Sequence, residues 1–255
     1  VLRDKDLARC TPEELREAHR LMAALRLHPP LRPSRRRRPD RRSRRGAPVD
    51  LRRSVRDALA NDGEILRLAT TRRTTRPRRV VLLIDVSGSM APYARALARF
   101  AHAAVAGRGA GRVEVFALGT RLTRITRELS THDPDAALAA AAAVVTDWDG
   151  GTRLGDGLRT FNDQWGVRGL ARSAVVVLLS DGWDRGDPGV LAAEVARLRR
   201  VAHRVVWVNP LRASPGYEPL ARGMAAALPH LDSFVDGHSV ASLESLVRLV
   251  GEDGS

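Results

Sequence analysis

Three loops of this chain carry hydroxyl and carboxylate oxygens at spacings that suit a metal ion. They are Asp85-Val86-Ser87-Gly88-Ser89, Gly150-Gly151-Thr152 and Ser180-Asp181-Gly182. Residues at positions i, i+2 and i+4 of a loop can direct three oxygens toward one point. Hard cations take oxygen ligands of this kind, with Mg²⁺ at about 2.1 Å. We therefore predict a Mg²⁺ or Mn²⁺ site formed by Asp85, Ser87, Ser89, Thr152 and Asp181.

The predicted ligand set leaves room for one more oxygen. Two carboxylates and three hydroxyls do not fill the coordination sphere, so water or an outside donor can complete it. The carboxylates also offset the unfavourable field of a helix N-terminus on a cation. Neighbouring side chains either belong to an outer shell or rim of the site or are ordinary loop and packing residues: Asp147, Trp148, Asp149, Asp156, Trp183, Asp184 and Asp187.

The elements that position these loops alternate between strand and helix. Apolar runs predict strands at 80–85, 112–118, 173–180, 204–209 and 231–235, with a further strand at 120–126. Helical spacing predicts helices at 91–106, 134–145, 191–202, 216–228 and 240–250. This order predicts an α/β domain over residues 79–250 with a Rossmann-like open, mostly parallel sheet flanked by helices. Ligands of such sheets bind at the carboxyl ends of the strands, where the oxygen-bearing loops lie.

The positive charge is concentrated ahead of this domain. The formal net charge is +14, and the segment from Arg26 to Arg79, with 19 Arg and 5 acids, accounts for all of it. Residues 28–78 therefore form an Arg-rich linker or arm, with 34–49 extended or disordered and a short helix at 50–60. Residues 64–76 either pair as an edge strand or remain a loop. A protein partner, an inert linker and a nucleic-acid contact are all open interpretations, although nucleic acid is disfavoured because the run has no interleaved aromatics.

Residues 1–27 are predicted to contain one amphipathic helix, at 11–27, with Thr11 as its N-cap. A single such helix cannot bury its own apolar face. It either docks on the following domain or is the end of a larger helical region.

The three loops resemble the metal-ion-dependent adhesion site of the von Willebrand factor A (VWA) family, which is defined by DxSxS, a distant Thr and a distant Asp. The resemblance implies that Ser87, Ser89 and Thr152 coordinate the metal through their hydroxyls. It implies that Asp85 and Asp181 act mostly through bridging waters, and that an acidic side chain of a partner fills the open position.

Further motifs resemble the CoxE-like branch of VWA proteins: FALGTRLTRITREL (116–129), DWDGGTRLGDGL (147–158), SDGWDRGDP (180–188), VVWVNPL (205–211) and GYEPLARGM (216–224). Such proteins are typically encoded beside MoxR-type AAA+ ATPases and help to mature a client metalloenzyme, aerobic carbon monoxide dehydrogenase. They usually carry a larger helical region before the Arg-rich stretch. We therefore expect 1–27 to be the end of such a region, shortened by truncation or a misassigned start.

The favoured function is a non-catalytic, metal-dependent adaptor rather than an enzyme. The alternatives are a Mg²⁺-dependent hydrolase or phosphotransferase that uses the DxSxS loop, and an RNA-associated scaffold that uses the basic arm. No G-x-S-x-G elbow, Walker loop or DxDxT motif supports catalysis, and no His stands in the motif loops as a base. The single cysteine, Cys10, and the lack of a membrane-length apolar run predict a cytoplasmic protein.

Overall fold

The computed structural model describes residues 1–40, 46–64, 67–107, 113–145, 151–214, 216–218 and 221–252. The chain folds as two compact units. One consists of Val1–Pro30 and Arg78–Ser255, and the other of Leu31–Pro77. The first thirty residues thus belong to the same unit as the α/β domain. In the sequence, the Arg-rich segment is inserted between the two parts of that unit.

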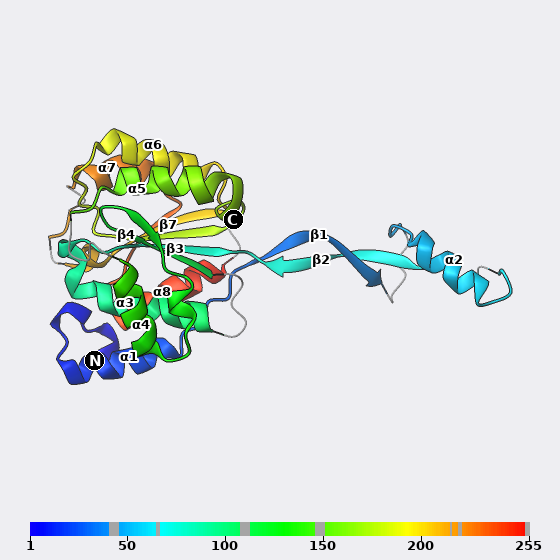
Figure 1. Ribbon diagram of the computed structural model, residues 1–255, viewed down its shortest axis with the longest axis horizontal. Helices are drawn as coiled ribbons and strands as arrows, with labels where there is room; N and C mark the ends of the chain where they lie inside the picture. The colour runs from blue at the N-terminus through cyan, green and yellow to red at the C-terminus, as the bar shows by residue number, and fades with distance from the viewer. Residues whose placement is uncertain are drawn as a thin grey trace. The chain divides into compact units, whose positions relative to one another are not determined.

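The larger unit is built on a six-stranded sheet with the order β5-β4-β3-β6-β7-β8 (Figure 1). Its strands are β3 (Val80–Asp85), β4 (Val113–Leu118), β5 (Leu122–Arg124), β6 (Val175–Leu179), β7 (Arg204–Asn209) and β8 (Ser233–Asp236). Strand β5 runs antiparallel to β4, and the other neighbours are parallel. The predicted open, mostly parallel α/β fold is confirmed.

Helices cover both faces of this sheet (Figure 1). One face carries α1 (Pro12–Ala23), α3 (Ala91–Ala106), α4 (Pro134–Val144) and α8 (Val240–Gly251), and the other carries α5 (Leu154–Phe161), α6 (Pro188–Arg199) and α7 (Arg222–Ala227). Alternate residues of β3 enter opposite cores, so Leu82 and Ile84 pack in one apolar cluster and Leu83 in the other. Burial on both faces explains why the strand sequence is apolar throughout.

Connections within this unit contain short helical turns. The 3₁₀ turns are Leu2–Asp4, Leu7–Arg9, Gly88–Met90, Glu128–Ser130, Pro210–Ala213 and Leu228–His230, and Asn162–Leu170 forms a π-helical segment directly after α5. The sequence prediction contained no helix at 154–170. It also placed a helix at 216–228 that is shorter in the structure, where α7 starts at Arg222. None of the described helices has the length and apolar content needed to cross a membrane.

The N-terminal helix α1 docks on the α/β domain. Thr11 and Glu14 form a reciprocal capping box at its start. Its apolar face buries Ala18 and Met22 in the same cluster as Leu97 of α3. Of the two arrangements left open by the sequence, the structure therefore contains the docked one.

The smaller unit is a two-stranded antiparallel ribbon with one helix. Strand β1 (Leu31–Asp40) pairs with β2 (Thr70–Pro77), and α2 (Leu51–Leu59) starts at the N-cap Asp50, which accepts a hydrogen bond from Arg53 N at 3.2 Å. Residues 34–40 thus take the extended form that was expected, and residues 70–76 take the strand alternative. Residues 41–45 of the Arg run lie outside the described residues.

Candidate metal centre

The candidate site lies where two neighbouring parallel strands end. Asp85 is the last residue of β3, and Ser180 and Asp181 follow directly after β6. Because β3 and β6 are paired in register, their carboxyl ends bring the two loops together. Thr152 approaches from a third segment, two residues before α5 begins. The topology therefore places all three loops at one edge of the sheet, as the sequence predicted.

Asp85 is the centre of the hydrogen-bond network. Its side chain is fully buried. Oδ1 accepts hydrogen bonds from Ser87 N (2.9 Å) and from Thr152 Oγ1 (2.9 Å). Oδ2 accepts one from Ser180 Oγ (2.6 Å). One carboxylate thus joins the three loops, and all its described hydrogen-bond donors are neutral.

The two serines of the DVSGS loop lie between this buried carboxylate and solvent. The Ser87 and Ser89 hydroxyls are 3.1 Å apart. Ser87 is buried, whereas Ser89 is exposed. The exposed Ser89 hydroxyl is therefore where a donor from another molecule can approach the site.

Asp181 lies close enough to Asp85 to change its protonation. Burial raises the pKa of Asp85 above its ordinary value, and the negative charge of Asp181 raises it further, against hydrogen bonds from Ser180 and Ser87 that lower it. Among the described ion pairs, none involves Asp85 or Asp181. Two buried carboxylates without a cationic side chain are costly unless a cation lies beside them. A divalent metal fits this oxygen set.

Backbone geometry holds the Asp181 loop in place. Asp181 Oδ1 accepts a hydrogen bond from Trp183 N (3.0 Å), and Ser180 Oγ accepts one from Gly182 N (3.0 Å). Gly182 has φ +82°, and a Cβ at this position would stand 2.9 Å from Met224 Cβ. Only glycine satisfies both conditions, so the turn that presents Asp181 requires it.

Several residues of the site were not among those predicted. Ser180 binds Asp85 directly, and its signal in the sequence was its position next to Asp181. Trp207 Nε1 donates to Ser180 O (2.8 Å), and Asn209 Nδ2 donates to Asp181 O (3.0 Å), so β7 fixes the loop from the next strand. Asn209 Nδ2 also donates to Tyr217 Oη (2.8 Å). Burial raises the pKa of Tyr217, and the charge of Asp181 raises it further, which places this phenol near the site.

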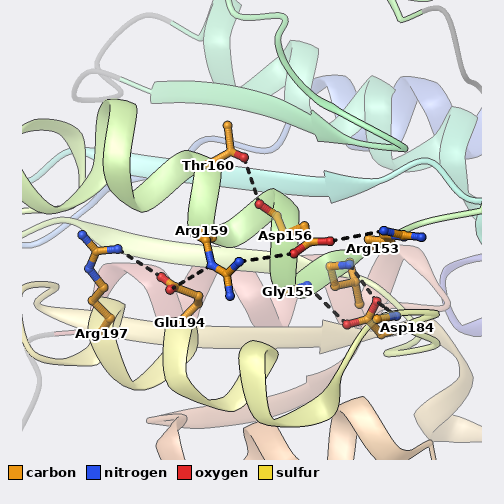
Figure 2. Close-up of polar contacts among 10 residues, drawn as sticks. Arg153, Gly155, Asp156, Arg159, Thr160, Asp184, Glu194 and Arg197 are labelled. Atoms are coloured by element: carbon orange, nitrogen blue, oxygen red, sulfur yellow. Dashed lines mark hydrogen bonds and ion pairs between the residues drawn. The ribbon is translucent and has the colours of Figure 1, made fainter.

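Asp184 positions the Thr152 loop from outside the site. Its Oδ1 accepts a hydrogen bond from Leu154 N (2.9 Å) and its Oδ2 one from Gly155 N (3.2 Å), so it caps the first turn of α5 (Figure 2). Arg185 N donates to Thr152 O (3.2 Å) alongside. The sequence left Asp184 as either an outer-shell residue of the site or an ordinary loop acid. Its hydrogen bonds to the start of α5 favour the outer-shell role.

The other acids and tryptophans near the motif are dispersed. Asp187 caps α6 through Gly189 N. Asp156 lies in a surface charge network with Arg153, Arg159 and Glu194 (Figure 2). Trp183 is exposed next to Asp181. Asp147, Trp148, Asp149 and Gly150 lie outside the described residues.

In the described part of the chain, no group of three or more His, Cys, Asp or Glu side chains is arranged to hold a metal ion. The candidate centre differs from such clusters because three of its five oxygen donors are hydroxyls.

A family model for "VWA domain containing CoxE-like protein" matches residues 21–243. Similar solved structures include a VWA protein from Catenulispora acidiphila, with 22% identity over 72% of this chain and 44% of that chain and a TM-score of 0.44. Manganese-loaded TRAP from Plasmodium vivax is also similar, with 15% identity over 69% of this chain and 74% of that chain and a TM-score of 0.47. A third similar structure is mussel byssus proximal thread matrix protein 1 with a zinc-occupied metal-ion-dependent adhesion site (MIDAS) motif. It has 18% identity over 68% of this chain and 44% of that chain and a TM-score of 0.45. This chain spans less than half the length of the Catenulispora and mussel chains. No curated protein matches.

Proposed function

The chain belongs to the family of VWA-domain-containing CoxE-like proteins, and on that basis we propose that it is a non-catalytic, metal-dependent adaptor that binds an acidic side chain of a partner protein. Asp85, Ser87, Ser89, Thr152 and Asp181 would hold Mg²⁺ or Mn²⁺. When bound, the cation supplies a coordination position for a carboxylate oxygen from outside the chain.

One observation carries this proposal: two buried carboxylates, which no described ion pair joins to a cationic side chain, lie beside the hydroxyls of buried Ser87 and exposed Ser89. The buried side of the site is closed, since Asp85 already receives hydrogen bonds on both oxygens. The approach for a ligand is therefore over Ser89. An approach over the exposed Ser89 suits a protruding Asp or Glu of a protein surface.

An adaptor role is also supported by what surrounds Ser87. Its hydroxyl pairs with that of Ser89 and lies beside the buried Asp85 carboxylate, and no described hydrogen bond joins it to a His or Lys that would act as the base. A nucleophilic serine needs such a base within about 3.2 Å.

We further propose that the partner is a MoxR-type AAA+ ATPase and that the pair matures a client metalloenzyme of the carbon monoxide dehydrogenase type in the cytoplasm. The family resemblance supports this assignment. The smaller unit gives it a second support, because residues 31–77 carry 16 Arg and 5 acids and so attract an acidic protein surface.

Calorimetric titration of Mg²⁺ and Mn²⁺ into the full chain tests the metal site. We expect saturable binding that is lost in Asp85→Ala/Asp181→Ala. Asp163→Ala is the matched control, because Asp163 is an exposed acid of the π-helical segment Asn162–Leu170 that pairs with Arg197 of α6. If the wild type shows no binding of Mg²⁺ or Mn²⁺, even with added acetate to supply the missing carboxylate, the proposal is contradicted.

Binding to a purified MoxR-type AAA+ ATPase from the same source tests the adaptor role. Biolayer interferometry in Mg²⁺ and in EDTA should give a complex in the first buffer and a complex at least tenfold weaker in the second. Equal affinity in both buffers would mean that the metal site does not carry the interaction.

A further inference from the structure

A cavity of about 260 Å³ lies on the face of the sheet covered by α1, α3 and α4, away from the metal loops. Five of its lining residues are cationic or can become so: His19, Arg26, Arg99, His102 and His132. Among the described residues that line it there is no Asp or Glu. Side chains of one polarity that converge from three separate segments form a candidate ligand site.

Two nitrogen atoms at this cavity are buried without a hydrogen-bond partner. They are His19 Nε2 and Arg99 Nε. The Arg99 side chain is 13% exposed, and its described ion pair is to Asp135, whose side chain is 72% exposed. Unsatisfied buried donors are rare, because each costs about 1–3 kcal/mol. A ligand with oxygen acceptors would satisfy both, with the proton of the neutral His19 ring on Nε2.

Two other cavity residues are fixed by the backbone. Arg26 Nη1 donates to Ala23 O (2.6 Å) and Leu25 O (2.9 Å) at the end of α1. His102 Nε2 lies 2.9 Å from Thr131 O, just before α4. The cavity walls are therefore held in position before any ligand binds, which lowers the ordering cost of binding.

The charged groups around His19 leave an excess of positive charge. Burial and the charges of Arg99 and Arg95 lower the pKa of His19 to about 4, and Asp135 is the acid that opposes them. The imidazole is thus kept neutral at pH 7, first by its burial and then by the neighbouring cationic side chains. A bound anion would reverse part of this effect.

We propose that this cavity binds a small oxyanion of the phosphate class, either as the free ion or as a phosphoester. At about 260 Å³ it lies below the roughly 300–1,000 Å³ of pockets for larger organic ligands. Arg and His are the residues that pair with phosphate oxygens. This inference does not depend on the metal site. Helix α3 starts beside the DVSGS loop, and His102 lies about 18 Å further along its axis than Met90.

Calorimetric titration of inorganic phosphate into the full chain, in chloride buffer at pH 7, tests this inference. We expect saturable binding, weakened at least tenfold in His19→Gln/Arg99→Gln. His230→Gln is the control, since His230 does not line the cavity. Because loss of Arg99 removes its ion pair with Asp135, thermal melts check the fold of the double variant, and single His19→Gln is measured beside it.

The ligand class is tested by parallel titrations with phosphoserine and acetate. Tighter binding of phosphoserine than of phosphate indicates a phosphoester as the natural ligand, and the reverse order indicates the free ion. Both results support an oxyanion site. Three results would overturn the proposal. The wild type would not bind phosphate, or His19→Gln/Arg99→Gln and His19→Gln would both bind phosphate as tightly as the wild type does, or the wild type would bind acetate as tightly as phosphate.

Discussion

At the scale of single residues, Thr152 is the sharpest probe of the candidate site, because its hydroxyl reaches Asp85 from a separate loop. Thr152→Ala removes one oxygen and leaves the fold of α5 in place, so we expect a loss of Mg²⁺ affinity of about 10–100-fold. Thr152→Ser should restore most of it. Calorimetry measures both.

Thr160→Ala is the matched control for this change, because the Thr160 hydroxyl donates only to Asp156 O, within α5 (Figure 2). Wild-type affinity in Thr152→Ala would exclude Thr152 from the metal site.

His19 gives the larger unit a pH dependence whose sign is fixed. Its pKa is about 4 in the folded chain, against 6.5 ordinarily, so the unfolded chain binds the proton more readily. The stability that neutral His19 contributes is complete above pH 6.5 and is lost as the pH falls through about 4. After allowance for solvent screening of this partly buried ring, we expect about 1 kcal/mol.

Urea unfolding between these two pH values, in phosphate-free chloride buffer, measures the effect. His19→Gln should show a shallower loss of stability than the wild type, while His230→Gln should follow the wild type. Parallel curves for His19→Gln and wild type would mean that His19 does not contribute.

The five predicted site residues could be named from the sequence because each lies in a short motif directly after a strand or before a helix. The specific roles of Ser180, Asn209 and Asp184 could not be predicted in this way. Their roles depend on contacts between loops 28 to 95 residues apart, such as Ser180 Oγ to Asp85 Oδ2 and Asp184 to Leu154 N. Ser, Asn and Asp at a turn serve equally well as local caps, so their type alone does not identify a long-range partner.

At the scale of elements, apolar residues on helices contribute to stability only where a partner covers them. Leu97 on α3 is fully buried, whereas Leu51 on α2 is 71% exposed. Leu97→Ala should therefore cost about 2–5 kcal/mol. Leu51→Ala should stay within about 0.5 kcal/mol.

Chemical unfolding followed by circular dichroism compares the two variants. Both replace Leu by Ala in a helix, so helix propensity changes equally and burial is the variable. A cost for Leu51→Ala near that of Leu97→Ala would show that another surface covers α2 in solution.

Helix α5 shows why one element escaped prediction. Its apolar residues Leu154, Leu158 and Phe161 have helical spacing, but Gly155 and Gly157 lower its propensity. Both glycines lie close to other elements: a Cβ at Gly157 would lie 2.7 Å from Leu118 Cδ2, and one at Gly155 would lie 3.0 Å from Leu191 N. Tertiary contacts thus favour glycines whose low helix propensity makes α5 hard to recognise from the local sequence.

At the scale of the whole molecule, charge separates the two units in a way that composition alone conceals. The smaller unit carries a net charge of +11 and the larger unit +3. The sequence placed the excess correctly. The sequence could not show where the N-terminal helix packs. An amphipathic pattern indicates that one face of a helix is covered, but it does not identify the element that covers it.

The smaller unit should be removable. Arg78 N donates to Pro30 O (2.9 Å), so the two ends of the larger unit meet where the inserted segment leaves and returns. Replacing residues 31–77 by Gly-Gly should leave Mg²⁺ binding unchanged. The melting temperature of the remaining unit should move by no more than about 2 °C, since none of its buried side chains is lost and the connecting loop becomes shorter.

Deletion of residues 1–27 is the contrasting variant, because it removes Leu7, Met22 and Leu27, each at most 2% exposed, from the core on α3. Burial of three large apolar side chains is worth more than about 4 kcal/mol, so this variant should melt far below the wild type. Differential scanning calorimetry compares the two deletions. If excision of 31–77 is the more damaging one, the Arg-rich segment is part of the folding unit, and its charge then has to be explained within that unit rather than by a partner.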